Sequence, residues 1–142
     1  MPNNFEIEAA IPHRKPMLLV DQVVEKSARR IVCRKRYLPD EFFVHGHFPG
    51  FPLVPGVILC ESVMQSGAIL LADLVPPSSA VPVATRMDNV KFKKMVRPND
   101  EVEIEVTLNE VVSTAYFMTG KVTCQGKLAA RLDFACTIAV PE

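Results

Sequence analysis

The stretch FFVHGHFPGFPLVPGVILCESVMQSGAILLA, residues 42–72, decides the fold of this chain. Its first part alternates prolines, which fix φ, with glycines, which free it, and this alternation predicts a rigid loop with tight bends. Its second part is almost wholly apolar from Val57 onward, which is typical of a helix buried in a core or a membrane. Two polar side chains interrupt the stretch where chemistry could use them, His47 in the loop and Glu61 in the helix.

The start of this helix is predicted to be a binding site. Pro55 suits the first helical position, and Gly56 behind it leaves the amide-rich helix start open to an anion or a carbonyl group. Glu61 and Gln65 share one face of the helix because they are four residues apart. An unpaired buried carboxylate is costly, so Glu61 is expected either to be protonated or to face a polar cavity.

The composition of the whole chain narrows the choice of function. Its 142 residues fit a single domain, 1–142, and the equal counts of 16 basic and 16 acidic residues argue against a general nucleic-acid binder. Four widely separated cysteines and a start without signal-peptide features indicate a reduced, cytoplasmic chain. The long apolar helix contains Glu61, which argues against a membrane span.

Periodicity predicts the remaining elements. Alternation of apolar and polar residues is clearest in the last third of the chain, where long strands joined by short turns predict an antiparallel meander. The expected elements are a short helix at Phe5–Ala10 and strands at Met17–Val24, Ile31–Tyr37 (basic on one face), Val81–Thr85, Met87–Phe92, Val102–Leu108, Thr114–Cys124 and Leu128–Ile138, with turns or loops at Pro76–Ser79, Arg97–Asp100 and Gln125–Gly126.

One helix that is apolar all round and several strands with one apolar face predict an α+β fold. A curved antiparallel sheet wrapped around a long central helix buries all of these surfaces at once. The exposed edges of such a sheet favour pairing with a second copy of the chain.

Four motifs of the sequence resemble one known family. The string H-F-P-G-x-P-x-x-P-G-V at 47–57, followed by E-x-x-x-Q at 61–65, resembles the (3R)-3-hydroxyacyl-[acyl carrier protein] dehydratases of bacterial type II fatty acid synthesis. The likeness extends to I-P-H-R-x-P-x-L-L-V-D at 11–21 and K-F-K-K-x-V-R-P-x-D at 91–100. It therefore spans nearly the full chain.

The resemblance implies the hot-dog fold, a homodimer with active sites at the interface, and in some members a trimer of dimers, that is, a homohexamer. It also implies that His47 and Glu61 form the catalytic dyad and come from different subunits, although either a cis or a trans pair is reachable from the residues alone. Glutamate at position 61 favours the dehydratase over the related dehydratase/isomerase. An aromatic gate often precedes the aspartate matching Asp88, and the residues before it here, 81–87, contain no Tyr or Phe.

The residues suit dehydration of a 3-hydroxyacyl thioester. Neutral His47 can accept the C2 proton, and Glu61, desolvated by apolar neighbours such as Val57 and Ile58, can protonate the leaving hydroxyl. The amides of Gly56 and Val57 can stabilise the enolate-like thioester oxygen at the helix start. Gln65 is expected to orient the carboxylate, and the chemistry needs neither a cofactor nor a metal.

Several alternatives stay open. His45 and His47 could suggest a metal pair, but the sequence indicates no third ligand. Lys91, Lys93, Lys94 and Arg97 could be an ordinary solvated face, or, as the resemblance implies, a basic rim that receives acyl carrier protein with its phosphopantetheine-linked acyl chain. A hot-dog acyl thioesterase and a non-catalytic protein that binds acyl carrier protein are the two rival functions.

Overall fold

A computed structural model describes residues 6–46, 48–74 and 81–139 of the chain. The helices are α1 (Ile7–Ala10), α2 (Phe42–His45) and α3 (Gly56–Leu71), which runs into the short 3-10 helix η1 (Ala72–Leu74). The strands are β1 (Gln22–Lys26), β2 (Arg30–Arg36), β3 (Val81–Phe92), β4 (Glu101–Val112), β5 (Ala115–Cys124) and β6 (Lys127–Ala139). The described strands form a six-stranded antiparallel sheet in the order β1-β2-β4-β5-β6-β3.

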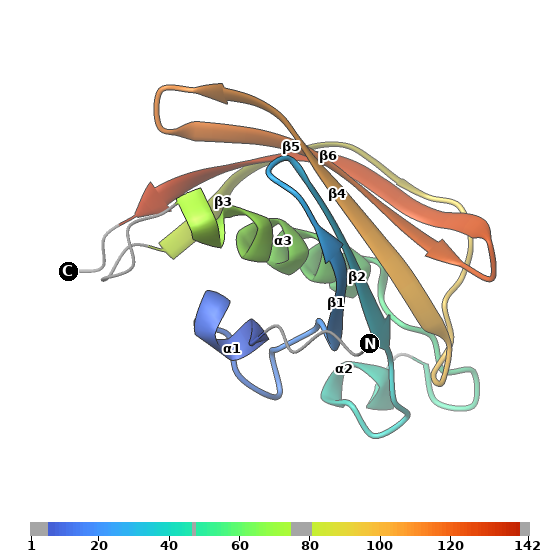
Figure 1. Cartoon of the computed structure of the whole chain (residues 1–142). Coiled ribbons are helices and arrows are strands. Elements are labelled where there is room, and N and C mark those ends of the chain that lie inside the picture. Colours follow the sequence, from blue (N-terminus) through green and yellow to red (C-terminus); the bar gives the residue numbers. More distant parts are fainter. Residues whose placement is uncertain (1–5, 47, 75–80, 140–142) are drawn as a thin grey trace.

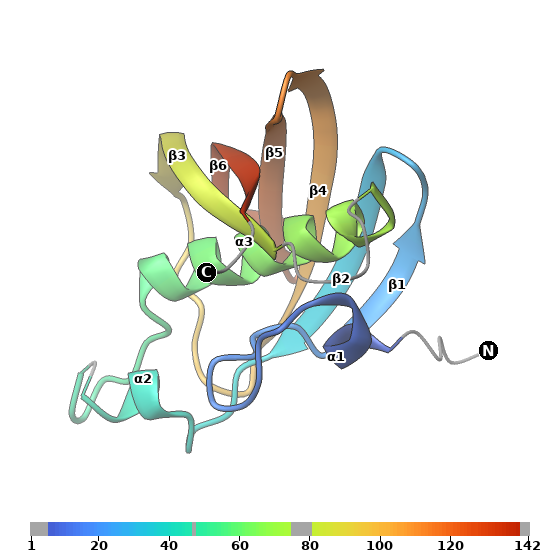
Figure 2. The same cartoon turned by 90° about the vertical axis from the view of Figure 1, so that its left-hand side faces the viewer.

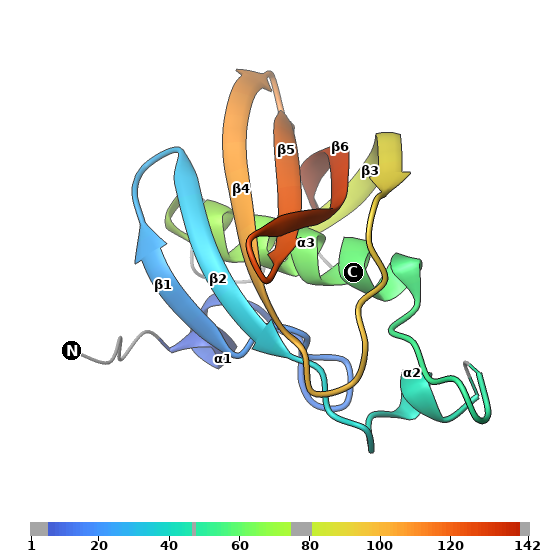
Figure 3. The ribbon, with the colours of Figure 1, turned by 90° about the vertical axis from the view of Figure 1, so that its right-hand side faces the viewer.

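The sheet curves around α3 (Figures 1 and 2). Helix α3 takes the chain from β2 to the opposite edge of the sheet, where β3 begins, and residues 93–100 return it to β4 beside β2 (Figure 3). The N-terminal segment with α1 lies on the other side of α3 from β4, β5 and β6 (Figure 1). The predicted architecture, a central helix wrapped by a curved antiparallel sheet, is confirmed.

The meander β4-β5-β6 forms where periodicity predicts it. Val102, Ile104, Val106 and Leu108 are all buried, while Glu101 and Glu103, at alternate positions of the strand, are exposed. The turn at Gln125 and Gly126 joins β5 to β6 with φ values of 53° and 76°, in the left-handed region that two-residue hairpin turns require. The predicted turn at Arg97–Asp100 is also confirmed, with Asn99 at a φ of 74°.

Helix α3 packs very closely on the sheet at two glycines. A Cβ on Gly120 of β5 would collide with the branched side chain of Val63. A Cβ on Gly67 of the helix would lie 2.8 Å from the ring of Phe134 on β6. The absence of a side chain at these two positions therefore sets the distance between helix and sheet.

The predicted strand at Met17–Val24 is wrong in its first half, because β1 begins only at Gln22. The amides of Met17 and Leu18 donate to the carbonyl of Arg14, and the amide of Leu19 donates to the side chain of Gln65. Leu19 is fully buried, whereas Met17 is exposed, and the backbone of this segment pairs with a turn and with the side chain of Gln65 instead of a neighbouring strand. The predicted short helix is confirmed for Ile7–Ala10.

Three further expectations need correction. The two strands predicted before and after Arg86 are one bulged edge strand, β3. The stretch from Phe42 is not all loop, since α2 forms a single turn there. Pro55 caps α3 with an extended ψ of 140°, so Gly56 is the first helical residue. The predicted loop at Pro76–Ser79 lies outside the described residues.

The four cysteines are free and buried within the fold. Burial raises the pKa of Cys33 and of Cys136 to about 11, so neither thiol is a ready nucleophile. The segment Gly56–Leu74 is long and apolar enough to cross a membrane, but most of it is buried inside this fold, as expected for a core helix.

Candidate active site

The loop before α3 is the first part of the candidate site. Its catalytic candidate, His47, lies outside the described residues. Just after this residue in the sequence, Phe48 and Phe51 exchange two backbone hydrogen bonds of 2.9 and 3.3 Å around Gly50, whose φ is 82°. Two residues before it in the sequence, His45 is exposed at the end of α2. No group of three His, Cys, Asp or Glu side chains that could hold a metal ion occurs in the described parts of the chain.

The first turn of α3 presents free amides, as predicted. The carbonyl of Pro55 accepts hydrogen bonds from Ile58 and Leu59, while the amides of Gly56 and Val57 donate to no other described residue. These two residues line a hollow of about 720 Å³ together with Phe92, whose ring would lie 2.8 Å from a Cβ at Gly56. The helix start is therefore accessible and has room for a ligand.

Glu61 lies one turn further along the helix, on the side that the single chain leaves open. Its Oε2 accepts a hydrogen bond of 3.0 Å from Nε2 of Gln65 and lies 3.8 Å from Nε2 of His13. Its Oε1 accepts no hydrogen bond from the described residues. The expected desolvation by Val57 is wrong for the single chain, because that side chain is 71% exposed and Glu61 itself is 28% exposed.

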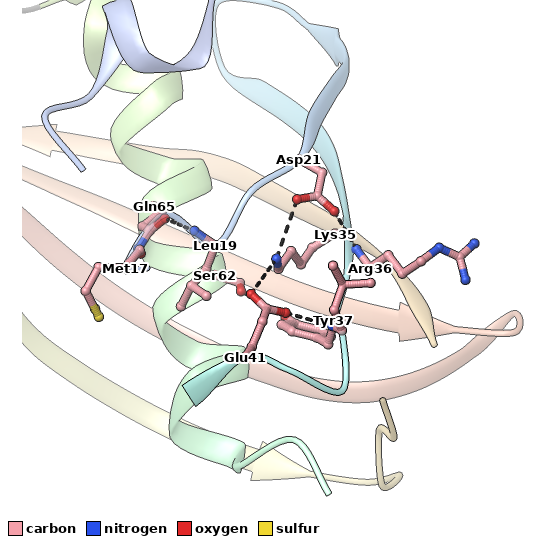
Figure 4. Close-up of polar contacts among 10 residues, drawn as sticks. Met17, Leu19, Asp21, Lys35, Arg36, Tyr37, Glu41, Ser62 and Gln65 are labelled. Atoms are coloured by element: carbon pink, nitrogen blue, oxygen red, sulfur yellow. Dashed lines mark hydrogen bonds and ion pairs between the residues drawn. The ribbon is translucent and has the colours of Figure 1, made fainter. Parts of the chain in front are cut away.

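Gln65 supports this carboxylate, as the spacing predicts. Its side chain is 1% exposed and lies between α3 and the N-terminal segment (Figure 4). Its Oε1 accepts 2.8 Å from the amide of Leu19, and its Nε2 donates 2.7 Å to the carbonyl of Met17 as well as to Glu61. The amide thus has a partner for each of its hydrogens.

An ion cluster around a buried lysine lies close by, and the sequence does not predict it. Lys35 lies among basic residues of the strand predicted at 31–37, but its side chain is only 6% exposed. Its Nζ lies 3.0 Å from Glu41 and 3.5 Å from Asp21 (Figure 4). The remaining oxygens of these carboxylates accept from the backbone amides of Leu38 and Arg36. The cluster therefore ties β2 both to the chain before β1 and to the residue that precedes α2.

A second buried contact links the end of β2 to the helix beside Glu61. The hydroxyls of Tyr37 and Ser62 are 2.8 Å apart, and both side chains are fully buried. Burial raises the pKa of Tyr37, so its hydroxyl stays neutral. This contact fixes α3 without touching the carboxylate of Glu61.

The basic residues proposed for docking lie at the surface. Lys93 and Lys94 line the same hollow as the helix-start amides, and Lys91 is exposed on the edge strand β3. Arg97 stacks on the ring of Phe51, 5.0 Å from its centroid, and lines a separate hollow of about 540 Å³ with His45. The structure thus brings two of the four next to the predicted carbonyl site.

Together, these residues offer a carboxyl group, amides at a helix start and an adjoining apolar hollow; one carboxyl oxygen and both amides have no hydrogen-bond partner among the described residues. A neutral carboxyl can donate a proton, and helix-start amides can stabilise an oxyanion. The arrangement therefore suits chemistry on a carbonyl compound. The fold alone leaves the reaction open.

Comparison with solved structures supports the fold. A chain of the dehydratase heterocomplex ApeI:P from Xenorhabdus doucetiae is similar over 99% of this chain and 93% of its own length, with a TM-score of 0.83 and 17% identity. A hypothetical thioesterase with coenzyme A from Streptococcus pneumoniae TIGR4 is similar over 85% and 87%, with a TM-score of 0.66 and 13% identity. These likenesses show the hot-dog fold.

Comparison of sequences identifies the family. The family described as ApeI-like, ApeI dehydratase, matches residues 23–131. The 3-hydroxyacyl-[acyl-carrier-protein] dehydratase FabZ of Streptococcus pyogenes serotype M3 is 41% identical over 133 residues, which cover 92% of this chain and 96% of the relative. The FabZ of Oenococcus oeni is 39% identical over 90% and 93%. The chain belongs to the 3-hydroxyacyl-[acyl-carrier-protein] dehydratase family and is a hydro-lyase.

Proposed function

We propose that the chain converts (3R)-3-hydroxyacyl thioesters on acyl carrier protein to trans-2-enoyl thioesters, in fatty acid or related acyl-chain biosynthesis in the cytoplasm. The observation that carries this proposal is the carboxyl group of Glu61, which has one oxygen held by Gln65 and another that accepts no hydrogen bond from the described residues. It lies one helical turn from the amides of Gly56 and Val57, which have no partner in the described part of the chain. The relatives at about 40% identity are 3-hydroxyacyl-[acyl-carrier-protein] dehydratases.

In the proposed reaction, His47 accepts the proton from C2, and the electrons of that C–H bond form the C2–C3 double bond. The C3–O bond breaks, and the leaving hydroxyl takes the proton of Glu61 to give water. Proton transfers from C2 to His47 and from Glu61 to the C3 hydroxyl both contribute to the rate, because neither loss of the C2 proton nor loss of the hydroxyl is easy at neutral pH. Support for these roles comes from the motif that contains both residues and from the open position of Glu61.

The amides of Gly56 and Val57 are proposed to bind the thioester carbonyl. Removal of the C2 proton places negative charge on that oxygen, and donors already fixed at a helix start stabilise it without reorganisation. The hollow beside them would receive the substrate close to the thioester, and Lys93 and Lys94 at its border would meet the acidic carrier protein. No cofactor enters this scheme.

The active site is proposed to be completed by a second copy of the chain, and such dimers could assemble further into trimers of dimers. Strand β3 is an edge of the sheet, and it carries exposed apolar residues, including Met87 at 42% and Phe92 at 52%. Val57 on the open side of α3 is 71% exposed. A second copy would cover these surfaces and supply His47 in trans to Glu61.

The test is an optical assay of enoyl-thioester formation and hydration with purified variants. We expect His47→Ala and Glu61→Gln each to lower turnover by a factor of about 10² to 10⁴, because each removes one general acid or base. Unfolding curves should match those of the wild type, since Glu61 is partly exposed and remains hydrogen-bonded as an amide.

Two results would contradict the proposal. Wild-type turnover by either variant would exclude its residue from the dyad. Release of free thiol from the substrate, without a change in enoyl absorbance, would indicate a thioesterase, because dehydration leaves the thioester bond intact.

A further inference from the structure

The orientation of the Gln65 side-chain amide is fixed by the backbone of the N-terminal segment. The backbone N–H of Leu19 can only donate, so the Gln65 atom 2.8 Å from it is the oxygen. The carbonyl of Met17 can only accept, so the atom 2.7 Å from it is the nitrogen. The remaining hydrogen of that nitrogen is therefore directed at Oε2 of Glu61, 3.0 Å away.

A neutral carboxyl group has one carbonyl oxygen, which accepts hydrogen bonds, and one hydroxyl oxygen, which donates. Because Gln65 donates to Oε2 of Glu61, that atom takes the role of the carbonyl oxygen. We propose that the acidic hydrogen of Glu61 resides on Oε1, and that Met17 and Leu19 dictate this placement through the Gln65 amide. This inference rests on the proposed role of Glu61 as the acid.

His13 lies on the same side of Glu61. Its Nδ1 is buried and has no hydrogen-bond partner among the described residues. An unpaired acceptor costs less there than an unpaired N–H, so the tautomer with hydrogen on Nε2 fits this site better. Nε2 lies 3.8 Å from Oε2 of Glu61, too far for a hydrogen bond, so Gln65 is the donor to that oxygen among the described residues. Arg14, which follows His13 in the sequence, donates to the carbonyl of His13 and pairs with Glu8, so its charge has partners other than Glu61.

This placement matters for the reaction because Oε1 is the oxygen without a donor from the described residues. With the hydrogen on Oε1, the carboxyl presents a donor to the leaving hydroxyl of the substrate. As the proton departs, negative charge grows on both oxygens of Glu61, and the hydrogen bond from Gln65 becomes charge-assisted and stronger. Gln65 is therefore a positioning residue whose interaction increases toward the transition state.

The experiment compares Gln65→Met, Gln65→Glu and the control Ser62→Ala in the optical dehydration assay across pH. We expect both Gln65 variants to lower kcat about 100-fold with little change in KM, as expected when a catalytic group loses its alignment. One limb of the pH–rate profile should also move to higher pH, because the ionised form of Glu61 has lost a donor. Gln65→Glu keeps an acceptor for Leu19, so the test does not depend on the methionine variant alone.

Ser62→Ala is a matched control because it removes a buried hydrogen bond of 2.8 Å from the same helix without touching Glu61. It should lower stability by about 1–3 kcal/mol, by leaving the Tyr37 hydroxyl unpaired, and move neither limb. The inference would be overturned if the pH–rate profiles of both Gln65 variants matched that of the wild type, or if Ser62→Ala lowered kcat as much as they do. A fully active Glu61→Gln would instead contradict the proposed function.

Discussion

The two sides of α3 are built in different ways. On the side of the sheet, Val63 packs against Gly120 and Gly67 packs against Phe134, and both contacts are close and apolar. On the side of the N-terminal segment, Gln65 forms directed hydrogen bonds. Its partners are the backbone of Met17 and Leu19, more than forty residues away in the sequence, and the carboxylate of Glu61, four residues away on the helix.

This difference separates what holds the fold from what performs the chemistry. Apolar packing stabilises by buried area and is tolerant of direction, whereas hydrogen bonds to a carboxyl fix individual atoms. Glu61, the proposed acid, lies where the helix has directed hydrogen-bond partners on one side and a partly exposed surface on the other. We therefore expect substitutions on the two sides to separate stability from turnover.

The largest loss of stability should come from the ion cluster at Lys35, which joins β2 to Asp21 of the N-terminal segment and to Glu41. Lys35→Met removes the cation between Glu41 and Asp21 and leaves Glu41, which is 18% exposed, without its charge partner. Breaking a buried ion pair in this way costs about 3 kcal/mol. Urea unfolding followed by circular dichroism would measure the change.

Lys121→Met is the matched control, because Lys121 is exposed on β5. It should change the free energy of unfolding by less than about 0.5 kcal/mol. Equal stability of the two variants would mean that the ion cluster around Lys35 makes no net contribution to the free energy of unfolding, as is usual for ion pairs on a protein surface.

A somewhat smaller loss is expected on the sheet side, at Gly120. Gly120→Val places a branched side chain where Val63 already fills the space, and overpacking of this kind costs about 2 kcal/mol. Gly46→Ala tests the same type of change where no atom lies within 4 Å, so it should be close to neutral in the same urea titration. A destabilisation of Gly46→Ala equal to that of Gly120→Val would show that backbone freedom, and not packing, dominates.

The sequence predicts the sheet side well because apolar periodicity reports burial directly. The alternation at Val102–Leu108 and the apolar run of α3 locate the buried faces before any contact is known. The same rule fails at Met17–Val20, where Leu19 and Val20 are buried but the backbone of Leu19 bonds to a helix side chain and not to a strand. Periodicity shows that a residue is buried, but not which element covers it.

The polar side is harder to predict because its partners are distant in sequence. Gln65 could be paired with Glu61 by helical spacing, yet nothing local indicates that Met17 and Leu19 fix its amide. Lys35 is flanked by Arg34 and Arg36 in the sequence, and this basic run obscures its burial against Asp21 and Glu41. An apolar neighbour on each alternate position of β2 is the one hint that residue 35 faces inward.

The smallest effect is expected at the open surface beside the helix start, where charge should act on recognition alone. Reversing Lys91 and Lys94 to glutamate should raise KM for carrier-linked substrate about tenfold at low salt, because it removes steering of an acidic partner. Turnover of a small thioester should stay unchanged, since neither side chain contacts Glu61 or the helix-start amides by a hydrogen bond. The effect on KM should fade as salt rises and screens the charges. An equal loss on both substrates would instead mean that these lysines contribute to catalysis or to the fold. The residues needed for turnover would then include surface charges as well as the hydrogen-bonded side of α3.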